Sequence, residues 1–97
     1  MELIKIDIIN GQIIKRFSDD SVSSLLLSEL TNSQKVVVDN CIAMMKTMEN
    51  EWLFISINII NPITRLVFFL TLDTFTEFLY EDLTDEQKIL FNDFINL

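Results

Sequence analysis

The sequence predicts an α+β fold with an internally duplicated ββαα repeat and a four-stranded antiparallel sheet whose helices pack on one face. Two alignments within the chain support the duplication. Residues 4–10 and 55–61 share an Ile-x-Ile-x-Ile-Ile-Asn pattern at an offset of 51, and residues 29–35 and 82–88 share Leu-Thr-x-x-Gln-Lys at an offset of 53. Each copy also passes from alternating apolar residues to helical spacing, which is typical of strands followed by helices.

A chain of 97 residues is the size of one domain. We divide it into a first repeat at residues 1–50 and a second at residues 51–97. The offset changes by two residues where Gly11 of the first copy faces residues 62–64 of the second. Because turns tolerate insertions better than strands do, we expect this length change to be confined to the turn.

The first repeat opens with two predicted strands. Isoleucines alternate with charged residues over residues 4–8, a pattern typical of a half-buried strand. The pair Asn10 and Gly11 is a strong hairpin signal, so residues 12–17 are expected to return as the second strand. A pseudo-two-fold axis would then pair either the two first strands or the two second strands at the centre of the sheet, and the sequence does not choose between them.

Two helices are predicted to follow in each repeat. In the first repeat, Asp19 or Asp20 would cap a short helix that ends at Leu30. Thr31 and Gln34 form a capping box that opens a second helix. The apolar residues expected on the inner face of this second helix are Val37 or Val38, Cys41, Met45 and Met48.

The second repeat follows the same order. Residues 52–60 and 64–72 would form a hairpin and residues 73–83 a helix, and a second capping box, Thr84 and Gln87, would open the last helix. Residues 52–72 contain a single charge, Arg65, and therefore also raise the possibility of a membrane span. An arginine near mid-bilayer costs about 2.5–3.5 kcal/mol, and the segment is rich in β-branched and aromatic residues. We therefore favour strands.

One strand of the second repeat is apolar on both faces. Where the first copy has Lys15 and Arg16, the second has Phe68 and Phe69. Either helices bury both faces of this strand, or its outer residues form a surface for a second copy or another protein. The residues expected on such a surface are Trp52, Phe54, Val67 and Phe69.

The composition excludes most catalytic machinery. The chain has no histidine, which removes the commonest general base and zinc ligand. Its single glycine cannot build a phosphate-binding loop. Cys41 has no histidine to activate it and is interpreted as a small core residue. We therefore expect no enzyme activity, no cofactor and no metal site.

Acidic side chains are the most abundant functional groups. The chain carries 15 acidic and 7 basic residues. Residues 73–97 contain seven of the acids and only one base, Lys88. Within the predicted helix at residues 73–83, Asp73, Glu77 and Glu81 would lie on one face. This face is either simply solvated or kept negative to meet a basic partner. The full predicted acidic face comprises Asp73, Glu77, Glu81, Asp82, Asp85 and Glu86.

These observations favour a non-enzymatic protein-binding module. A net charge of -8 repels nucleic acids and anionic membranes and attracts basic protein surfaces. In type, such a small, acidic, histidine-free chain is similar to many phage and mobile-element proteins that bind and block a host protein. We therefore expect an inhibitor of a basic, nucleic-acid-handling host protein. The alternatives are a homo-oligomeric structural subunit, such as a homodimer, and a small-ligand binder. A single cysteine and an N-terminus without a signal pattern predict a cytoplasmic location.

Overall fold

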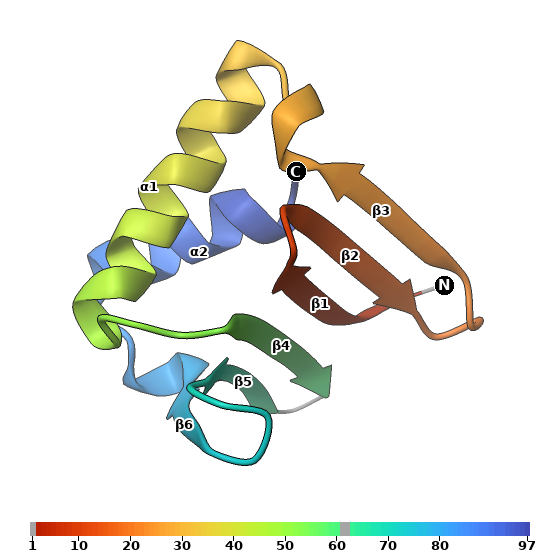
Figure 1. Cartoon of the computed structure of the whole chain (residues 1–97). Coiled ribbons are helices and arrows are strands. Elements are labelled where there is room, and N and C mark those ends of the chain that lie inside the picture. Colours follow the sequence, from red (N-terminus) through yellow and green to blue (C-terminus); the bar gives the residue numbers. More distant parts are fainter. Residues whose placement is uncertain (1, 61–62) are drawn as a thin grey trace.

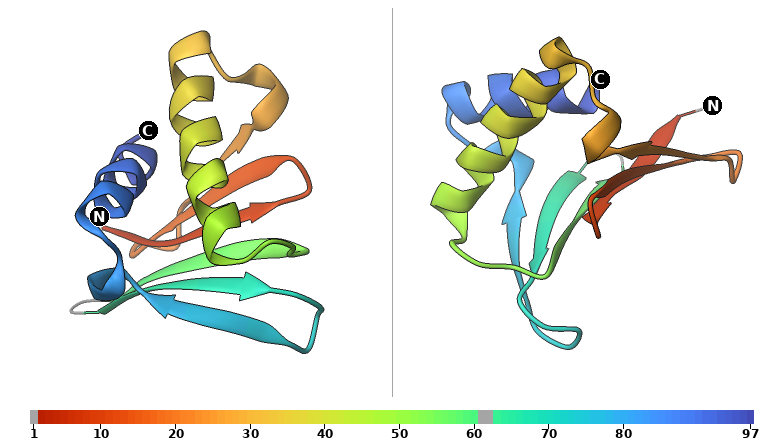
Figure 2. Two further views of the ribbon diagram at one scale, coloured as in Figure 1. Left: turned by 90° about the vertical axis from the view of Figure 1, so that its left-hand side faces the viewer. Right: turned by 45° about the horizontal axis from the view of Figure 1, so that its top comes forward.

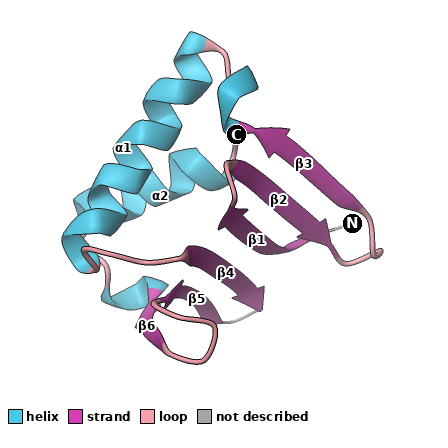
Figure 3. Ribbon diagram, in the orientation of Figure 1, coloured by secondary structure: helices cyan, strands magenta, loops and turns pink. Residues whose placement is uncertain are grey.

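The computed structural model describes residues 2–60 and 63–97 and shows an α+β fold, with six strands, two α-helices and two short 3-10 turns (Figures 1 and 3). All six strands belong to one antiparallel sheet in the order β3-β2-β1-β4-β5-β6. The elements in chain order are β1 (Leu3–Ile9), β2 (Gln12–Phe17), β3 (Val22–Leu26), η1 (Leu27–Glu29), α1 (Asn32–Met48), β4 (Phe54–Ile60), β5 (Ile63–Phe69), β6 (Phe75–Leu79), η2 (Tyr80–Asp82) and α2 (Asp85–Ile95).

The repeat is βββα, and the predicted ββαα repeat and four-stranded sheet are wrong. The helices expected at residues 19–30 and 73–83 are instead the edge strands β3 and β6, each followed by a 3-10 turn. Asp19 caps no helix, because its carboxylate accepts a hydrogen bond from the backbone N–H of Ser21 (3.0 Å) in the turn before β3. The backbone groups of β3 and β6 pair with β2 and β5, which supplies hydrogen bonds that a local helix would otherwise have made.

A pseudo-two-fold axis relates the two repeats and passes through the centre of the sheet. The two first strands, β1 and β4, are neighbours and run antiparallel. Ile6 lies opposite Ile57, which is its own equivalent at the offset of 51. The symmetry therefore places the axis at this pair, and it selects the first-strand pairing that the sequence left open.

The two-residue length difference lies in a strand, so its predicted confinement to the turn is wrong. Only two residues separate β1 from β2, and only two separate β4 from β5. The extra residues instead lie at the start of β5. At the offset of 53 that aligns the later parts of the repeats, Leu66 is the equivalent of Ile13. Leu66 nevertheless faces Ile57, whose equivalent Ile6 faces Lys15 in the first repeat. A shift of two residues keeps every side chain on its face of the sheet, which explains why the core tolerates it.

The first hairpin has the turn that its sequence predicts. Asn10 and Gly11 both adopt positive φ angles, of 51° and 73°. This left-handed backbone matches the twist of the flanking strands and is accessible at little cost to Asn and Gly. The predicted turn at Asn61 and Pro62 lies outside the described residues.

Both predicted capping boxes are present. The side chain of Thr31 accepts from the N–H of Gln34 (3.2 Å), and the side chain of Gln34 accepts from the N–H of Thr31 (3.0 Å). Thr84 and Gln87 make the same pair of bonds at the start of α2, at 3.2 and 2.9 Å. These bonds satisfy backbone donors that would otherwise lack partners in the first turn of each helix.

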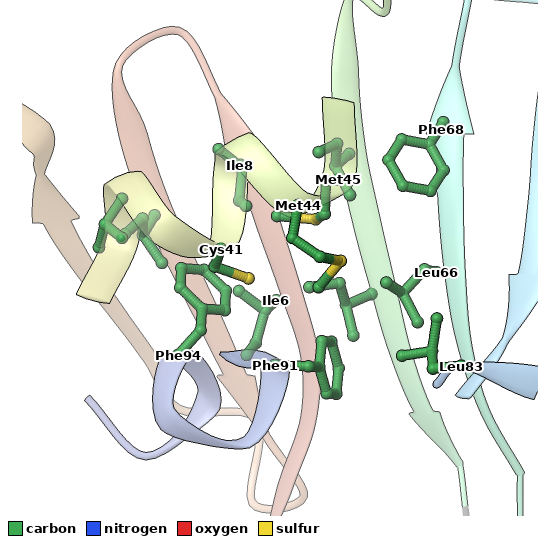
Figure 4. Packing of buried hydrophobic residues seen from close by; sticks show 14 residues of the cluster. Ile6, Ile8, Cys41, Met44, Met45, Leu66, Phe68, Leu83, Phe91 and Phe94 are labelled. Atoms are coloured by element: carbon green, nitrogen blue, oxygen red, sulfur yellow. The ribbon is translucent and has the colours of Figure 1, made fainter. Parts of the chain in front are cut away.

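Both helices cover the same face of the sheet, and one core lies between the two layers (Figure 2). Side chains of α1 and α2 point toward the strands, where Cys41 and Phe94 lie near Ile6 of β1, and Met45 lies near Phe68 of β5 (Figure 4). The core draws on both repeats. Its fully buried residues include Ile6, Ile13, Val38, Cys41, Met45, Ile55, Ile57, Leu66, Phe68, Phe91 and Phe94.

Candidate functional site

Burial shifts the pKa of two side chains, Cys41 and Lys15. Cys41 has no solvent exposure, and this burial raises the pKa of its thiol to about 12. Lys15 points toward the helices and donates from Nζ to the backbone oxygen of Leu97 (2.8 Å), and partial burial lowers its pKa. With no histidine in the chain, neither group has an imidazole base beside it.

Within residues 2–60 and 63–97, no group of three or more acidic, histidine or cysteine side chains could hold a metal ion. None of the helices in these ranges is long and apolar enough to cross a bilayer. Most of residues 52–72, which raised the possibility of a span, form β4 and β5.

The predicted acidic helix face does not exist as one stripe. Asp73 lies in the turn between β5 and β6, and Glu77 lies on β6. Glu77 is also engaged, because its Oε1 lies 3.2 Å from Nε of Arg65 on the neighbouring strand. The prediction of one helical face is wrong because residues 75–79 pair with β5 as an edge strand. The other four acids remain close in sequence around η2 and the start of α2.

We call these four residues, Glu81, Asp82, Asp85 and Glu86, the acidic rim. All four are exposed. Within the described part of the chain, ion pairs join only Lys5 to Asp7 and Arg65 to Glu77, so no rim carboxylate is neutralised by a basic side chain. Asp85 and Glu86 occupy the first turn of α2, where negative charge also interacts favourably with the helix dipole.

Packing holds the acidic rim in place. The ring of Tyr80 in η2 contacts Phe91 of α2, with a centroid distance of 5.4 Å. The Tyr80 hydroxyl also hydrogen-bonds to the amide of Asn92 (3.0–3.2 Å). Leu83, which lies between η2 and α2, is buried in the core. The rim carboxylates therefore project from a segment fixed at both ends.

A shallow groove with an apolar floor adjoins the acidic rim. It runs between the end of α1 and the η2–α2 junction, and Asp82 belongs to both groove and rim. Such a combination suits an apolar side chain flanked by positive charge. The residues that line the groove are Thr47, Met48, Phe78, Leu79, Asp82, Leu83 and Gln87.

The acidic rim belongs to the second repeat alone. At the offset of 53, its four positions correspond to Ser28, Glu29, Asn32 and Ser33 in the first repeat. The same backbone therefore carries four acids in one copy and one acid in the other. The fold does not need most of these charges, because η1 and α1 form with uncharged Ser28, Asn32 and Ser33 at three of the four positions.

The second candidate surface is the sheet face that the helices leave uncovered, which we call the open face (Figure 2). Leu66 and Phe68 of β5 are in the core, so the alternate residues Val67 and Phe69 point to the open face, where neighbouring side chains leave Val67 only 7% exposed. Helices thus bury only one of this strand's two apolar faces. The open-face positions of β5 and β6 are Ile63, Arg65, Val67, Phe69, Phe75, Glu77 and Leu79.

Three phenylalanines form an aromatic patch on the open face. The rings of Phe54 and Phe69 are stacked at a centroid distance of 4.4 Å, and Phe75 lies 5.6 Å from Phe69. Phe75 is 54% exposed. The sequence interpretation missed Phe75 because it placed residues 73–83 in a helix. The alternation in Phe-Thr-Glu-Phe-Leu was the available signal.

Trp52 departs from the surface expected for it. Its ring packs edge-on against Phe68, with a centroid distance of 5.5 Å, on the helix-covered side. Of the four residues predicted for the apolar surface, Phe54, Val67 and Phe69 therefore share the open face, and Trp52 does not.

No family model, curated protein or solved structure matches the chain. Its function is therefore argued from these two surfaces.

Proposed function

We propose that this chain is a non-enzymatic, cytoplasmic protein-binding module whose acidic rim binds the basic surface of a partner protein. The observation that carries this proposal is the position of four unneutralised carboxylates beside a groove with an apolar floor. A basic, nucleic-acid-handling protein presents the complementary chemistry. Occupying such a surface would block nucleic-acid binding, which is the action of an inhibitor.

Two further features support the acidic rim as the contact. First, the rim differs between two repeats that share one backbone, so most of these charges are not required by the fold. Second, the rim is held by the Tyr80–Asn92 hydrogen bonds and by Leu83. A preorganised surface loses less conformational entropy on binding than a mobile one. Long-range attraction between the rim and a basic patch would also accelerate association.

The internal repeat supplies a conservative test. The triple variant Glu81→Ser, Asp85→Asn, Glu86→Ser places first-repeat residues at the equivalent positions of the second and retains the capping box. A matched control removes three exposed acids elsewhere by Asp39→Asn, Glu51→Gln, Asp93→Asn. Both triple variants change the net charge from -8 by the same amount.

The native chain and the two variants would be immobilised and exposed to a host lysate, and retained proteins quantified by mass spectrometry across a salt series. We expect a stoichiometric basic partner on the native and control proteins. It should be lost from the rim variant and released as salt screens the charges. Equal retention by all three proteins, or a partner that resists high salt, would contradict the acidic-rim mechanism.

A further inference from the structure

On β5 and β6, the open face is unusually apolar for a sheet surface in contact with water. Antiparallel sheets with one solvated face normally alternate apolar residues inside with polar residues outside. Here the outward positions of β5 and β6 are mostly apolar, and large side chains on both halves of the face are exposed. The most exposed are Val22 (54%), Leu26 (41%), Ile63 (42%) and Phe75 (54%).

We propose that the open face packs against the open face of a second copy of this chain, with the two aromatic patches in contact. The product is a two-fold symmetric dimer in which two sheets stack about 10 Å apart and the helices lie outside. The inference is independent of the proposed function, because the acidic rim belongs to η2 and α2, on the opposite side of the sheet.

The distribution of charge favours a second copy over a basic partner at this face. The open face carries Lys5, Arg16 and Arg65 against Asp7 and Glu77, a formal charge of +1. Because the net charge of the whole chain is -8, the residues outside the open face together carry -9. The negative charge that makes two copies repel each other therefore lies outside this face. A basic partner gains nothing from a face that is itself slightly positive.

The area is adequate for a stable dimer. The strands have five to seven residues each, which gives a length of roughly 20 Å at about 3.4 Å per residue. Six strands about 4.8 Å apart give a width of roughly 29 Å, so the sheet covers about 600 Å². Side chains standing on this plane expose more surface than the plane itself. A standard interface takes about 800 Å² of accessible surface from each partner.

The first repeat again supplies the test substitutions. Arg16 and Val22 occupy the positions equivalent to Phe69 and Phe75 at the offset of 53. Phe69→Arg therefore introduces a residue that this fold already accepts at the equivalent site, and Phe75→Val does so at an exposed edge-strand site. Ile89→Arg is the matched control, because it adds the same charge at a 60% exposed apolar residue of α2, away from the sheet.

Sedimentation equilibrium would measure the mass of the native protein and of these variants from low micromolar to several hundred micromolar concentrations. We expect a dimer for the native protein and for Ile89→Arg. Phe69→Arg should weaken the dimer at least about tenfold, because it buries an unpaired charge among aromatic rings, and Phe75→Val should weaken it less. Circular dichroism would confirm that each variant retains its helices.

Several outcomes would overturn the inference. A native protein that stays monomeric throughout the concentration series would do so. A dimer that persists in both open-face variants would assign the contact to another surface, such as the free edges of β3 and β6. Loss of the dimer on Ile89→Arg alone would assign the contact to the helices. The acidic-rim variant should remain dimeric, so failure of the proposed function leaves this result unaffected.

Discussion

Cys41 illustrates how burial turns a reactive group into a structural one. It lies in the middle of α1 and packs in the core with Phe94 and Ile6. Desolvation disfavours the thiolate and raises the pKa of the thiol from 9.0 to about 12. The sequence argument reached the same conclusion from the lack of histidine and from helical spacing, because both are local properties of the chain. A nucleophilic role would require exposure and a nearby positive charge.

The raised pKa predicts a pH dependence of stability. Above pH 9 the unfolded chain loses the thiol proton while the folded chain keeps it until about pH 12. The folded state then binds more protons, so the free energy of unfolding falls as pH rises, by about 1.4 kcal/mol per pH unit from this group. Cys41→Ala removes this contribution but adds a pH-independent cavity cost.

Urea denaturation of the native protein and of Cys41→Ala between pH 7 and pH 11 would measure this effect. The stability difference between the two proteins should be constant below pH 9 and narrow above it. Lysines and tyrosines titrate alike in both proteins and cancel in the comparison. Parallel stability curves over the whole range would show that the thiol is not desolvated in solution.

At the scale of elements, local signals predicted structure well and tertiary pairing did not. The capping boxes at Thr31 and Thr84, the Asn10–Gly11 turn and the alternation over β1 are all contained in a few neighbouring residues. The five-residue strands β3 and β6 lack such signals. Val22, Leu25 and Leu26 have spacings that fit a helix equally well, and only pairing with β2 decides for a strand.

The same limitation governs the candidate site. Reading residues 73–83 as a helix grouped Asp73, Glu77 and Glu81 on one face, whereas the edge strand separates Asp73 and Glu77 from the acidic rim. The excess of apolar residues in β5 was visible in the sequence, since alternation alone puts Val67 opposite to Phe68. Which face the helices cover depends on packing between distant elements, and no short segment encodes it.

The two capping boxes predict paired stability effects. Thr31→Ala and Thr84→Ala each remove a side-chain acceptor for an N–H in the first helical turn, and each should lower the free energy of unfolding by about 1 kcal/mol. Thr31→Ser and Thr84→Ser keep the hydroxyl and should change the free energy much less. Chemical denaturation would measure all four variants. Equal losses for Ala and Ser would show that the methyl group, rather than the cap, is responsible.

At the scale of the whole molecule, the two repeats complete each other. Each helix packs over strands that meet at the Ile6–Ile57 pair, and the buried cluster contains Met45 from one repeat and Phe91 from the other. Divergence then assigns different surfaces to equivalent backbones, with acids around η2 and phenylalanines on β5. A duplicated scaffold can therefore carry different surfaces on its two copies while both copies contribute to one core.

This shared core predicts that neither repeat folds alone. A fragment of residues 1–50 or 51–97 would expose one face of a central strand and half of the buried cluster, and chains of this length rarely bury enough surface to fold. Each fragment should lack cooperative thermal unfolding by circular dichroism at low micromolar concentration. An equimolar mixture should regain both the helical signal and the transition.

The matched control is a 1–50 fragment with Ile6→Asp, which places a charge at the symmetry axis and should fail to complement the 51–97 fragment. A cooperative, concentration-independent transition in either fragment alone would show that the repeats are separate folding units. The pseudo-symmetry would then reflect only the duplication of the sequence, and the central β1–β4 pairing would contribute little to the free energy of unfolding.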